Sequence, residues 1–554
     1  MYNLFVYINN RNINMKTSDL IVKILEKKWV KTVYWVPWEE NLDLLDSLQR
    51  SSIELVLTRN EQTAVFMAAT SWRYTGIPGV ALATLWPGAT NMMTWVAYAQ
   101  LWGMPVIVIT GQKPQNKSKQ WAFQIIDVVS MMKPVTKYAV SIVNGARVPY
   151  ILENAFNIAS SEKPGAVCLE LPEDIAAEIV EDPYAIVDLK TQKQRRPVID
   201  KKWVEILIQE MSQAKSPIIL IGSWANRKRV SKYLTEFIVK HNIPFFSSQM
   251  WKWVVDETLS QYIWTAALTS WDYIHEAINK SDLIISVGYD NVEKPTDILW
   301  INGKPVININ FVESNYDFVY SPYLDLIGDI WNLFWHLCEE YISQKWDFSE
   351  IYEQNIINQN KIEKNKELES EKPYMMPRKL VSDLQETLQA KDILALDNGL
   401  YKVWIARNFK AKFWNTVLLD NALATMWAGY STGMEAKRQN PESNVVCITG
   451  DGWLVMNLWD LETAVRLKID MTIVILNNES YGMIKWKQEH AGFWDYGLDF
   501  KNPDFVKLAE SFWAKWYKVE KKEDFKEILN KTLTEKWLKI IDLDFDYPID
   551  WIIK

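Results

Sequence analysis

Two apolar runs near the C-terminus constrain the fold more than any other part of the chain. The first covers residues 445–448 and ends in Gly450-Asp451-Gly452, and the second covers 471–476 and ends in Asn477-Asn478. A helical pattern lies between them at 458–467. A buried strand, a helix and a second buried strand in this order predict a parallel βαβ unit. Because ligands of open α/β sheets bind at the carboxyl ends of the strands, we expect Asp451 and Asn478 to lie side by side there.

The residues at this predicted edge suit a cation and a phosphate. Mg²⁺ takes hard oxygen ligands, which the Asp451 carboxylate, the Asn478 amide and the backbone carbonyl of Ser480 are predicted to provide. Gly450 and Gly452 let the backbone approach a diphosphate, whose charge a helix N-terminus favours. Taken alone, the stretch could also be a plain βαβ crossover with an ordinary turn.

The Gly-Asp-Gly triplet and the asparagine pair are separated by 24 residues, 453–476. This spacing resembles the thiamine-diphosphate signature of the acetolactate synthase and pyruvate oxidase superfamily, and the resemblance covers about residues 15–550. It implies an α/β protein with three domains, a pyrimidine-binding domain at 15–183, a middle domain at 200–342 and a diphosphate-binding domain at 377–550. The two thiamine-diphosphate-binding domains would contain parallel sheets and flank the middle α/β domain. The resemblance also implies a homodimer or homotetramer with active sites between subunits.

Composition excludes several other classes of protein. A chain of 554 residues is too long for one core and fits three domains. Its net charge of −8 does not indicate binding to nucleic acid or to an anionic membrane. No run reaches about 18 apolar residues and the start lacks a signal-peptide pattern, so we expect a cytoplasmic protein, with Met1 or Met15 as its first residue. Its three cysteines are far apart and are predicted to be reduced thiols.

The first α/β region carries polar clusters after four predicted strands. Thiamine chemistry needs a proton shared with the aminopyrimidine ring, and a carboxylic acid in an apolar cleft can share one because desolvation raises its pKa. Residues 59–66 resemble the acetolactate synthase segment that carries the catalytic glutamate, which implies this role for Glu61, with Asn60 in place of the family's histidine. The alternative is a solvated glutamate at a helix N-terminus. Further residues that match family positions near the substrate are Gln112, Phe123 and Gln124.

The resemblance also implies the cofactor-binding residues. Residues 85–91 resemble the loop on the pyrimidine side, 397–401 the loop that holds the diphosphate, and Met426 is our choice for the apolar prop under the bent cofactor. The metal ligands would be Asp451, Asn478 and Ser480. The full cofactor-binding set is Pro37, Glu61, Pro87, Asn91, Asn398, Gly399, Leu400, Tyr401, Met426, Gly450, Asp451, Gly452, Trp453, Asn478, Tyr481, Gly482 and Met483.

By resemblance, the chain decarboxylates pyruvate with thiamine diphosphate and Mg²⁺ and transfers the hydroxyethyl unit to a second 2-keto acid, as in branched-chain amino acid biosynthesis. The expected acceptor is pyruvate, because Lys487 occupies the position of a tryptophan found in enzymes that prefer 2-ketobutyrate. The middle domain of the family binds FAD in anabolic enzymes and is empty in catabolic ones, and the sequence leaves FAD and a regulatory subunit open. Alternatives are a pyruvate oxidase-like enzyme, another 2-keto acid decarboxylase, or a non-catalytic cofactor-binding scaffold.

Tryptophan is abnormally frequent. The chain has 29 tryptophans and 19 glycines, although an average glycine content of about 7% would give roughly 39. Many tryptophans occupy positions where the family has glycine, so we predict that they are glycines in the native protein, encoded by UGA. We expect UGA at Trp35, Trp38, Trp86, Trp95 and Trp427, and UGG at Trp404 and Trp486; the alternative is an unusually Trp-rich protein. Further tryptophans predicted to lie at turns or helix ends are Trp29, Trp72, Trp102, Trp121, Trp224, Trp251, Trp253, Trp264, Trp271, Trp453, Trp513 and Trp516.

Overall fold

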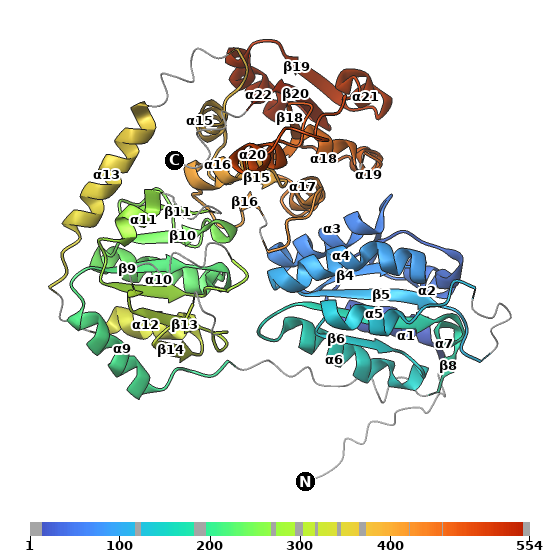
Figure 1. The fold of residues 1–554 in the computed structure, drawn as a ribbon. Helices are drawn as coiled ribbons and strands as arrows, with labels where there is room; N and C mark the ends of the chain where they lie inside the picture. Colours follow the sequence, from blue (N-terminus) through green and yellow to red (C-terminus); the bar gives the residue numbers. More distant parts are fainter. Residues whose placement is uncertain are drawn as a thin grey trace, which may run out of the picture. The chain divides into compact units, whose positions relative to one another are not determined.

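The computed structural model describes residues 14–116, 123–181, 196–267, 273–293, 303–315, 320–340, 345–364, 373–419, 422–456 and 458–546. The chain forms two compact units, Met1–Gln194 and Arg195–Lys554, and each is described by itself (Figure 1). Within the described ranges, no helix is long and apolar enough to cross a membrane.

The first unit is built on a six-stranded parallel sheet with the strand order β3-β2-β4-β5-β7-β6. Strands β4, β5 and β7 are buried along nearly their whole length, as expected for a parallel sheet covered on both faces. The strands are β2 (Thr32–Trp35), β3 (Glu54–Leu57), β4 (Gly79–Ala83), β5 (Val106–Gln112), β6 (Tyr138–Ser141) and β7 (Ala166–Pro172).

Helices cover both faces of this sheet (Figure 1). On one face the apolar side chains of α1, α2 and α6 form a single core with β2, β5 and β7. On the other face, Phe66 of α3 packs on Trp95 and Tyr98 of α4. The helices are α1 (Thr17–Lys27), α2 (Leu42–Gln49), α3 (Glu61–Thr75), α4 (Trp86–Trp102), α5 (Val128–Met132), α6 (Val148–Ser160) and α7 (Glu173–Ala177), and a short antiparallel pair joins β1 (Met15–Lys16) to β8 (Ile179–Val180).

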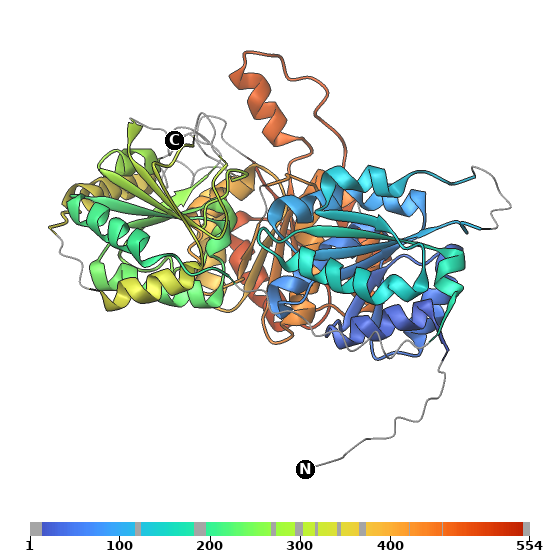
Figure 2. The same ribbon diagram turned by 90° about the horizontal axis from the view of Figure 1, so that it is seen from below.

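The second unit contains two more six-stranded parallel sheets. The sheet of the middle domain has the order β11-β10-β9-β12-β13-β14, and helices lie on both sides of it (Figure 2). Its elements are α9 (Lys201–Gln213), β9 (Pro217–Ile221), α10 (Lys228–His241), β10 (Phe245–Ser248), β11 (Tyr262–Ala266), α11 (Tyr273–Ile278), β12 (Leu283–Val287), β13 (Val306–Asn310), β14 (Leu324–Ile327), α12 (Ile330–Glu339) and α13 (Ser349–Lys364).

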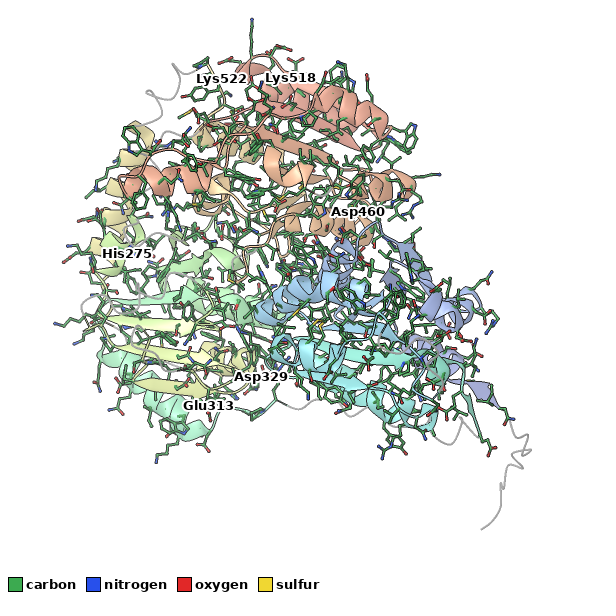
Figure 3. The ribbon with its side chains drawn as sticks, turned by 45° about the vertical axis from the view of Figure 1, so that its right-hand side comes forward. His275, Glu313, Asp329, Asp460, Lys518 and Lys522 are labelled. Atoms are coloured by element: carbon green, nitrogen blue, oxygen red, sulfur yellow. The ribbon has the colours of Figure 1, made fainter. Side chains whose placement is uncertain are left out.

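The C-terminal sheet has the order β16-β15-β17-β18-β20-β19, and β17 and β18 lie side by side as the βαβ prediction requires. At its far edge Lys518, labelled in Figure 3, binds Asp542 and Asp544 of β20. The elements are α15 (Pro377–Thr387), β15 (Ile393–Leu396), α16 (Leu400–Asn408), β16 (Val417–Leu418), α17 (Ala428–Gln439), β17 (Val445–Gly450), α18 (Asp451–Val455), α19 (Asp460–Arg466), β18 (Thr472–Asn477), α20 (Gly482–His490), α21 (Phe505–Ser511), β19 (Lys515–Val519), α22 (Phe525–Thr534) and β20 (Lys539–Asp544).

These three parallel sheets confirm the predicted fold class, whereas the placement of the tryptophans was predicted only in part. Trp95 lies in the middle of α4, and Trp264 and Trp516 lie inside β11 and β19, so the prediction of turns or helix ends is wrong for these three. Trp72 lies in the last turn of α3, where its carbonyl accepts from the Gly76 N–H of the cap. Trp95 is buried and packs on Phe66, whereas Trp516 is 40% exposed on the edge strand β19, so regular secondary structure and not a turn surrounds these positions. Trp121 and Trp271 fall outside the described residues.

The backbone angles of other tryptophans fit the glycine interpretation. Of the ten described non-glycine residues with a positive φ, five are tryptophans: Trp29 (65°), Trp253 (85°), Trp427 (75°), Trp513 (58°) and Trp537 (108°). Such angles are uncommon for bulky side chains and ordinary for glycine. Trp404 and Trp486, in contrast, lie inside α16 and α20.

Candidate active site

A cavity of about 640 Å³ opens at the carboxyl ends of the strands in the first unit. Residues that follow β2, β3 and β4 meet there, as the shared edge of a parallel sheet predicts. The cavity is lined by Val36, Trp38, Glu61, Thr84, Leu85, Trp86, Pro87, Gly88, Thr90, Asn91 and Gln124.

Glu61 is the first residue of α3, and its side chain is held by Asn91. Asn91 Nδ2 donates to Glu61 Oε2 at 2.5 Å and contacts Asn60 Oδ1 at 3.0 Å. Asn60 caps the helix by accepting from the Gln62 backbone N–H, and the Gln62 side chain donates to Asn91 Oδ1 at 3.2 Å. The glutamate is therefore fixed through Asn91, and Asn60 supports it only indirectly.

Gly88 provides the space beside this carboxylate. A Cβ atom at Gly88 would lie 3.2 Å from Glu61 Oε1 and 3.0 Å from Thr84 Cγ2. Contacts this short require the neighbours to move. The glycine therefore leaves Oε1 open toward the cavity, where it can meet a ligand.

The three predicted substrate-side residues are separated by the structure. Gln124 lines the cavity, with a φ of 55°. Gln112 lies outside the lining, and its amide donates to Glu170 Oε1 at 2.9 Å. Phe123 is 58% exposed and also lies outside the lining, as does Pro37. Glu61, Pro87, Asn91 and Gln124 are thus brought together, and Pro37, Gln112 and Phe123 are not.

Sequence reasoning missed a buried carboxylate at the same edge. Glu40, which is 3% exposed, forms an ion pair with Lys113 Nζ at 2.7 Å and accepts from Thr84 Oγ1 at 3.0 Å. It therefore links the loops after β2, β4 and β5. The sequence places Glu40 in a polar cluster after a strand, which is typical of a site residue. The neighbouring Glu39 makes a solvated helix start an equally good interpretation of the same pattern.

In the C-terminal domain, Asp451 joins the two motifs. Its carboxylate is buried; Oδ1 accepts from the Gly452 N–H at 2.8 Å, and Oδ2 accepts from the backbone N–H groups of Asn478 at 3.0 Å and Glu479 at 2.7 Å. Asn502 Nδ2 donates to Oδ2 at 2.8 Å. The predicted neighbourhood of Asp451 and Asn478 is therefore present, and Asn502 is an addition that the sequence did not signal.

The oxygen atoms here fit a magnesium ion that is also bound by a phosphate. Asp451 Oδ1 accepts one hydrogen bond and keeps capacity for a cation, and Ser480 Oγ is buried without a hydrogen-bond partner. Among the described residues, no cluster of three or more His, Cys, Asp or Glu side chains could hold a metal. A cation would therefore depend on one carboxylate, neutral oxygens and the ligand's own phosphate, which is the usual pattern for Mg²⁺.

The space beside Asp451 is small because an indole ring occupies part of it. The cavity has about 50 Å³, and Trp453 in its wall packs on Tyr481 with ring centroids 5.4 Å apart. A Cβ atom at Gly450 would lie 3.3 Å from Trp453 Cδ1. Of the predicted residues, Asn398 and Met426 do not line this cavity, and those that do are Gly399, Leu400, Tyr401, Gly450, Asp451, Gly452, Trp453, Asn478, Ser480, Tyr481, Gly482 and Met483.

A larger cavity of about 650 Å³ adjoins the same motif. It lies at the carboxyl ends of β18, β19 and β20 and shares Leu400, Asn478, Ser480 and Gly482 with the smaller one. Trp486 lines it and Lys487 does not. Asn478 and Ser480 therefore stand between the two spaces.

The parallel α/β domains, the carboxylate beside the first cavity and the Asp451–Asn478 edge together define an enzyme that binds a diphosphate-containing cofactor. The chain belongs to the thiamine pyrophosphate enzyme family. The family's N-terminal TPP binding domain matches residues 15–131, its central domain matches 204–337 and its C-terminal TPP binding domain matches 397–543. Together these matches cover more than half of the chain and confirm the predicted order of domains.

Curated relatives match along nearly their full length. The chain is 28% identical to the acetolactate synthase of Bacillus subtilis (strain 168), over 96% of this chain and 93% of the relative. It is 29% identical to a probable acetolactate synthase large subunit of Methanocaldococcus jannaschii, over 96% and 92% of the two chains. It is 27% identical to a catabolic acetolactate synthase of Raoultella terrigena, over 96% and 95%.

Proposed function

We propose that this protein decarboxylates pyruvate with thiamine pyrophosphate and transfers the two-carbon unit to a second pyruvate, giving 2-acetolactate. The acetolactate synthases among its relatives support this reaction. The observation that carries the proposal is the hydrogen bond from the Asn478 N–H to Asp451, which joins the two halves of the cofactor motif. The cofactor supplies the electron sink that decarboxylation of a 2-keto acid requires.

In this proposal, Asp451 Oδ1, the Asn478 side-chain oxygen and the Ser480 backbone carbonyl hold Mg²⁺. The Ser480 carbonyl accepts from the Gly482 N–H at 3.0 Å and keeps a second lone pair. Glu61 holds the proton that is shared with the pyrimidine ring, and Asn91 orients its carboxylate. The active protein is a dimer or tetramer in the cytoplasm, and its substrates are small 2-keto acids.

We further propose that the native protein carries glycine at many tryptophan positions. Forcing a side chain into the left-handed region costs roughly 1–2 kcal/mol per residue. The five tryptophans with positive φ would together cost an amount comparable with a total folding stability of about 5–15 kcal/mol. Glycine at Trp453 would also widen the cavity beside Asp451, where the diphosphate is expected.

The activity test uses protein from the native host, or recombinant protein with glycine at the five tryptophans with positive φ and at Trp453. Carbon dioxide and acetolactate are measured with pyruvate, Mg²⁺ and thiamine pyrophosphate. Both products should form only with the cofactor. Carbon dioxide without acetolactate would instead indicate a decarboxylase or an oxidase-like enzyme, and cofactor binding without either product would indicate a scaffold.

A further inference from the structure

The middle domain contains the topological switch point at which open α/β sheets bind dinucleotides. From β9 the chain adds β10 and β11 on one side, and then β12, β13 and β14 on the other. The switch point therefore lies between the carboxyl ends of β9 and β12. Residues 222–225 follow β9 and residues 288–293 follow β12, so these two loops would form the walls of a ligand crevice.

The two loops are in contact along their backbones. The Gly222 N–H donates to the Val287 carbonyl at 2.9 Å, and the Trp224 N–H donates to the Gly288 carbonyl at 2.8 Å. A Cβ atom at Gly222 would lie 2.4 Å from Tyr289 Cα. A Cβ atom at Gly288, whose φ is 62°, would lie 2.3 Å from the Ala225 nitrogen. These glycines bring the walls together and leave no width for a pyrophosphate between them.

A buried carboxylate occupies the hydrogen-bond donors of this crevice. Glu293 is fully buried, and its Oε1 accepts from the backbone N–H of Ser223 at 2.7 Å and of Asp290 at 3.3 Å. Ser248 Oγ at the end of β10 donates to Oε2. A phosphate of a bound dinucleotide would need the same donors, which Glu293 already uses. None of these bonds uses the side chain of Trp224, whose indole Nε1 donates to the Asp290 carboxylate at 2.9 Å.

The adjacent part of the same sheet edge also forms its polar contacts with other groups of the same chain. Lys252 and Glu257 form a fully buried ion pair at 2.8 Å, and Lys252 also donates to Thr265 Oγ1 at the end of β11. Glu257 Oε2 accepts from the Ala411 N–H at 2.9 Å, and the Glu257 N–H donates to the Ala411 carbonyl at 3.2 Å. Residues at this edge therefore bind the segment before β16 instead of a ligand.

We propose that the middle domain of this enzyme does not bind FAD or another dinucleotide, because Glu293 occupies its anion-binding donors and the glycine loops close its crevice. This inference rests on the family assignment and is independent of which keto acids the enzyme uses. The sequence leaves FAD binding by the middle domain open. In the structure, Glu293 of the same chain already binds the hydrogen-bond donors of the crevice.

The direct test is a flavin titration of the full-length protein loaded with thiamine pyrophosphate and Mg²⁺. The purified protein should show no flavin absorption, and excess FAD should not remain bound after equilibrium dialysis. One FAD per chain would overturn the proposal. This readout does not depend on turnover, so it stands whether or not acetolactate is formed.

A second experiment tests the role of Glu293 itself. Glu293→Ala should lower the melting temperature and leave an anion site formed by two N–H groups and one hydroxyl. Because a ligand that binds only the folded state stabilises it, added acetate should raise the melting temperature of Glu293→Ala more than that of the parent. The control is Glu313→Ala, an exposed acid of the same domain that is labelled in Figure 3. A destabilised Glu293→Ala that acetate does not rescue would show that the carboxylate does not fill an anion site.

Discussion

Asn91 donates its side-chain amide to the Glu61 carboxylate at 2.5 Å, and both residues line the cavity of about 640 Å³ in the first unit. The pair connects the N-terminus of α3 to α4, and so fixes the acid at the carboxyl edge of the sheet. The acid is held from one side, and Gly88 leaves room at its other oxygen. This arrangement suits a group that gives and takes one proton at a fixed position.

Replacing Glu61 by glutamine should slow turnover by about 10²–10⁴-fold, because general acid–base catalysis contributes that much. Glutamine keeps the size and can still bond to Asn91, so the cofactor should bind with nearly unchanged affinity in a calorimetric titration. Glu39→Gln is the matched control, since Glu39 is an exposed acid at the same sheet edge. A Glu61→Gln enzyme within about a factor of two of the parent rate would refute the assignment.

The metal assignment predicts different effects at two neighbouring residues. Asp451→Asn should raise the Mg²⁺ concentration needed for half-maximal activity by about tenfold or more, as loss of a metal-site interaction commonly does. Ser480→Ala should change it little, because the proposed ligand is the backbone carbonyl. A magnesium titration at saturating cofactor measures both. An increase as large for Ser480→Ala as for Asp451→Asn would instead assign the buried Ser480 hydroxyl as the ligand.

Stability should depend on pH through Glu293. Burial raises the pKa of this carboxyl to about 7, with Asp290 adding to the shift and hydrogen bonds from Ser248 and Ser223 opposing it. The folded state then holds the proton more tightly than the unfolded state, where a glutamate titrates near about 4.3. The contribution of the group to stability is therefore fully present below that value and decreases as the pH rises toward 7.

Comparison with Glu293→Gln isolates this contribution. From about pH 4.5 to pH 8 the parent should lose roughly 2–3 kcal/mol relative to the variant. Chemical unfolding followed at several pH values measures the difference. Parallel pH profiles for the two proteins would show that the pKa of Glu293 is the same in the folded and unfolded states.

Exposed tryptophans give a clean test of the glycine proposal. Trp29 and Trp513 are 69% and 68% exposed and have φ values of 65° and 58°. Each Trp→Gly change should stabilise the protein by roughly 1–2 kcal/mol, because backbone strain is relieved and little packing is lost. Trp459 is the matched control: it is 62% exposed with a φ of −59°, so glycine there should not stabilise. Equal effects at all three positions would contradict the argument from backbone angles.

Codon and peptide data test the same proposal in the source organism. The gene should read UGA at Trp427 and UGG at Trp404, and mass spectrometry of the native protein should find glycine and tryptophan at these positions respectively. Trp427 has a φ of 75° at the start of α17, whereas Trp404 lies in the middle of α16. Tryptophan found at Trp427 in active native protein would refute the proposal.

The βαβ unit around Asp451 was predictable because strand periodicity and a long spacing act together over 34 residues, 445–478. Glu61 and Asn91 were also predictable, since each follows a strand of the same sheet. Long-range contacts were not: the bonds from Asn502 to Asp451 and from Lys113 to Glu40 join residues far apart in the chain, and no local pattern marks them. Gln112 is the last residue of β5, and its amide is bonded to Glu170.

The closed crevice of the middle domain could likewise not be predicted from the sequence. Gly288 and Glu293 lie in an ordinary loop after β12, and only the fold brings the carboxylate to the Ser223 N–H of another loop. The backbone angles could not be predicted from the sequence either. Trp95 and Trp427 were both expected to be glycine positions, yet Trp95 lies within α4 and Trp427 has a left-handed backbone conformation.

The most direct test of the central claim follows carbon-labelled pyruvate by NMR in the presence of the enzyme, Mg²⁺ and thiamine pyrophosphate. The account predicts one acetolactate and one carbon dioxide for every two pyruvates consumed, and no reaction without the cofactor. Glu61→Gln should consume pyruvate about 10²–10⁴-fold more slowly than the parent. Unchanged pyruvate in the presence of glycine-restored protein with bound cofactor would contradict it.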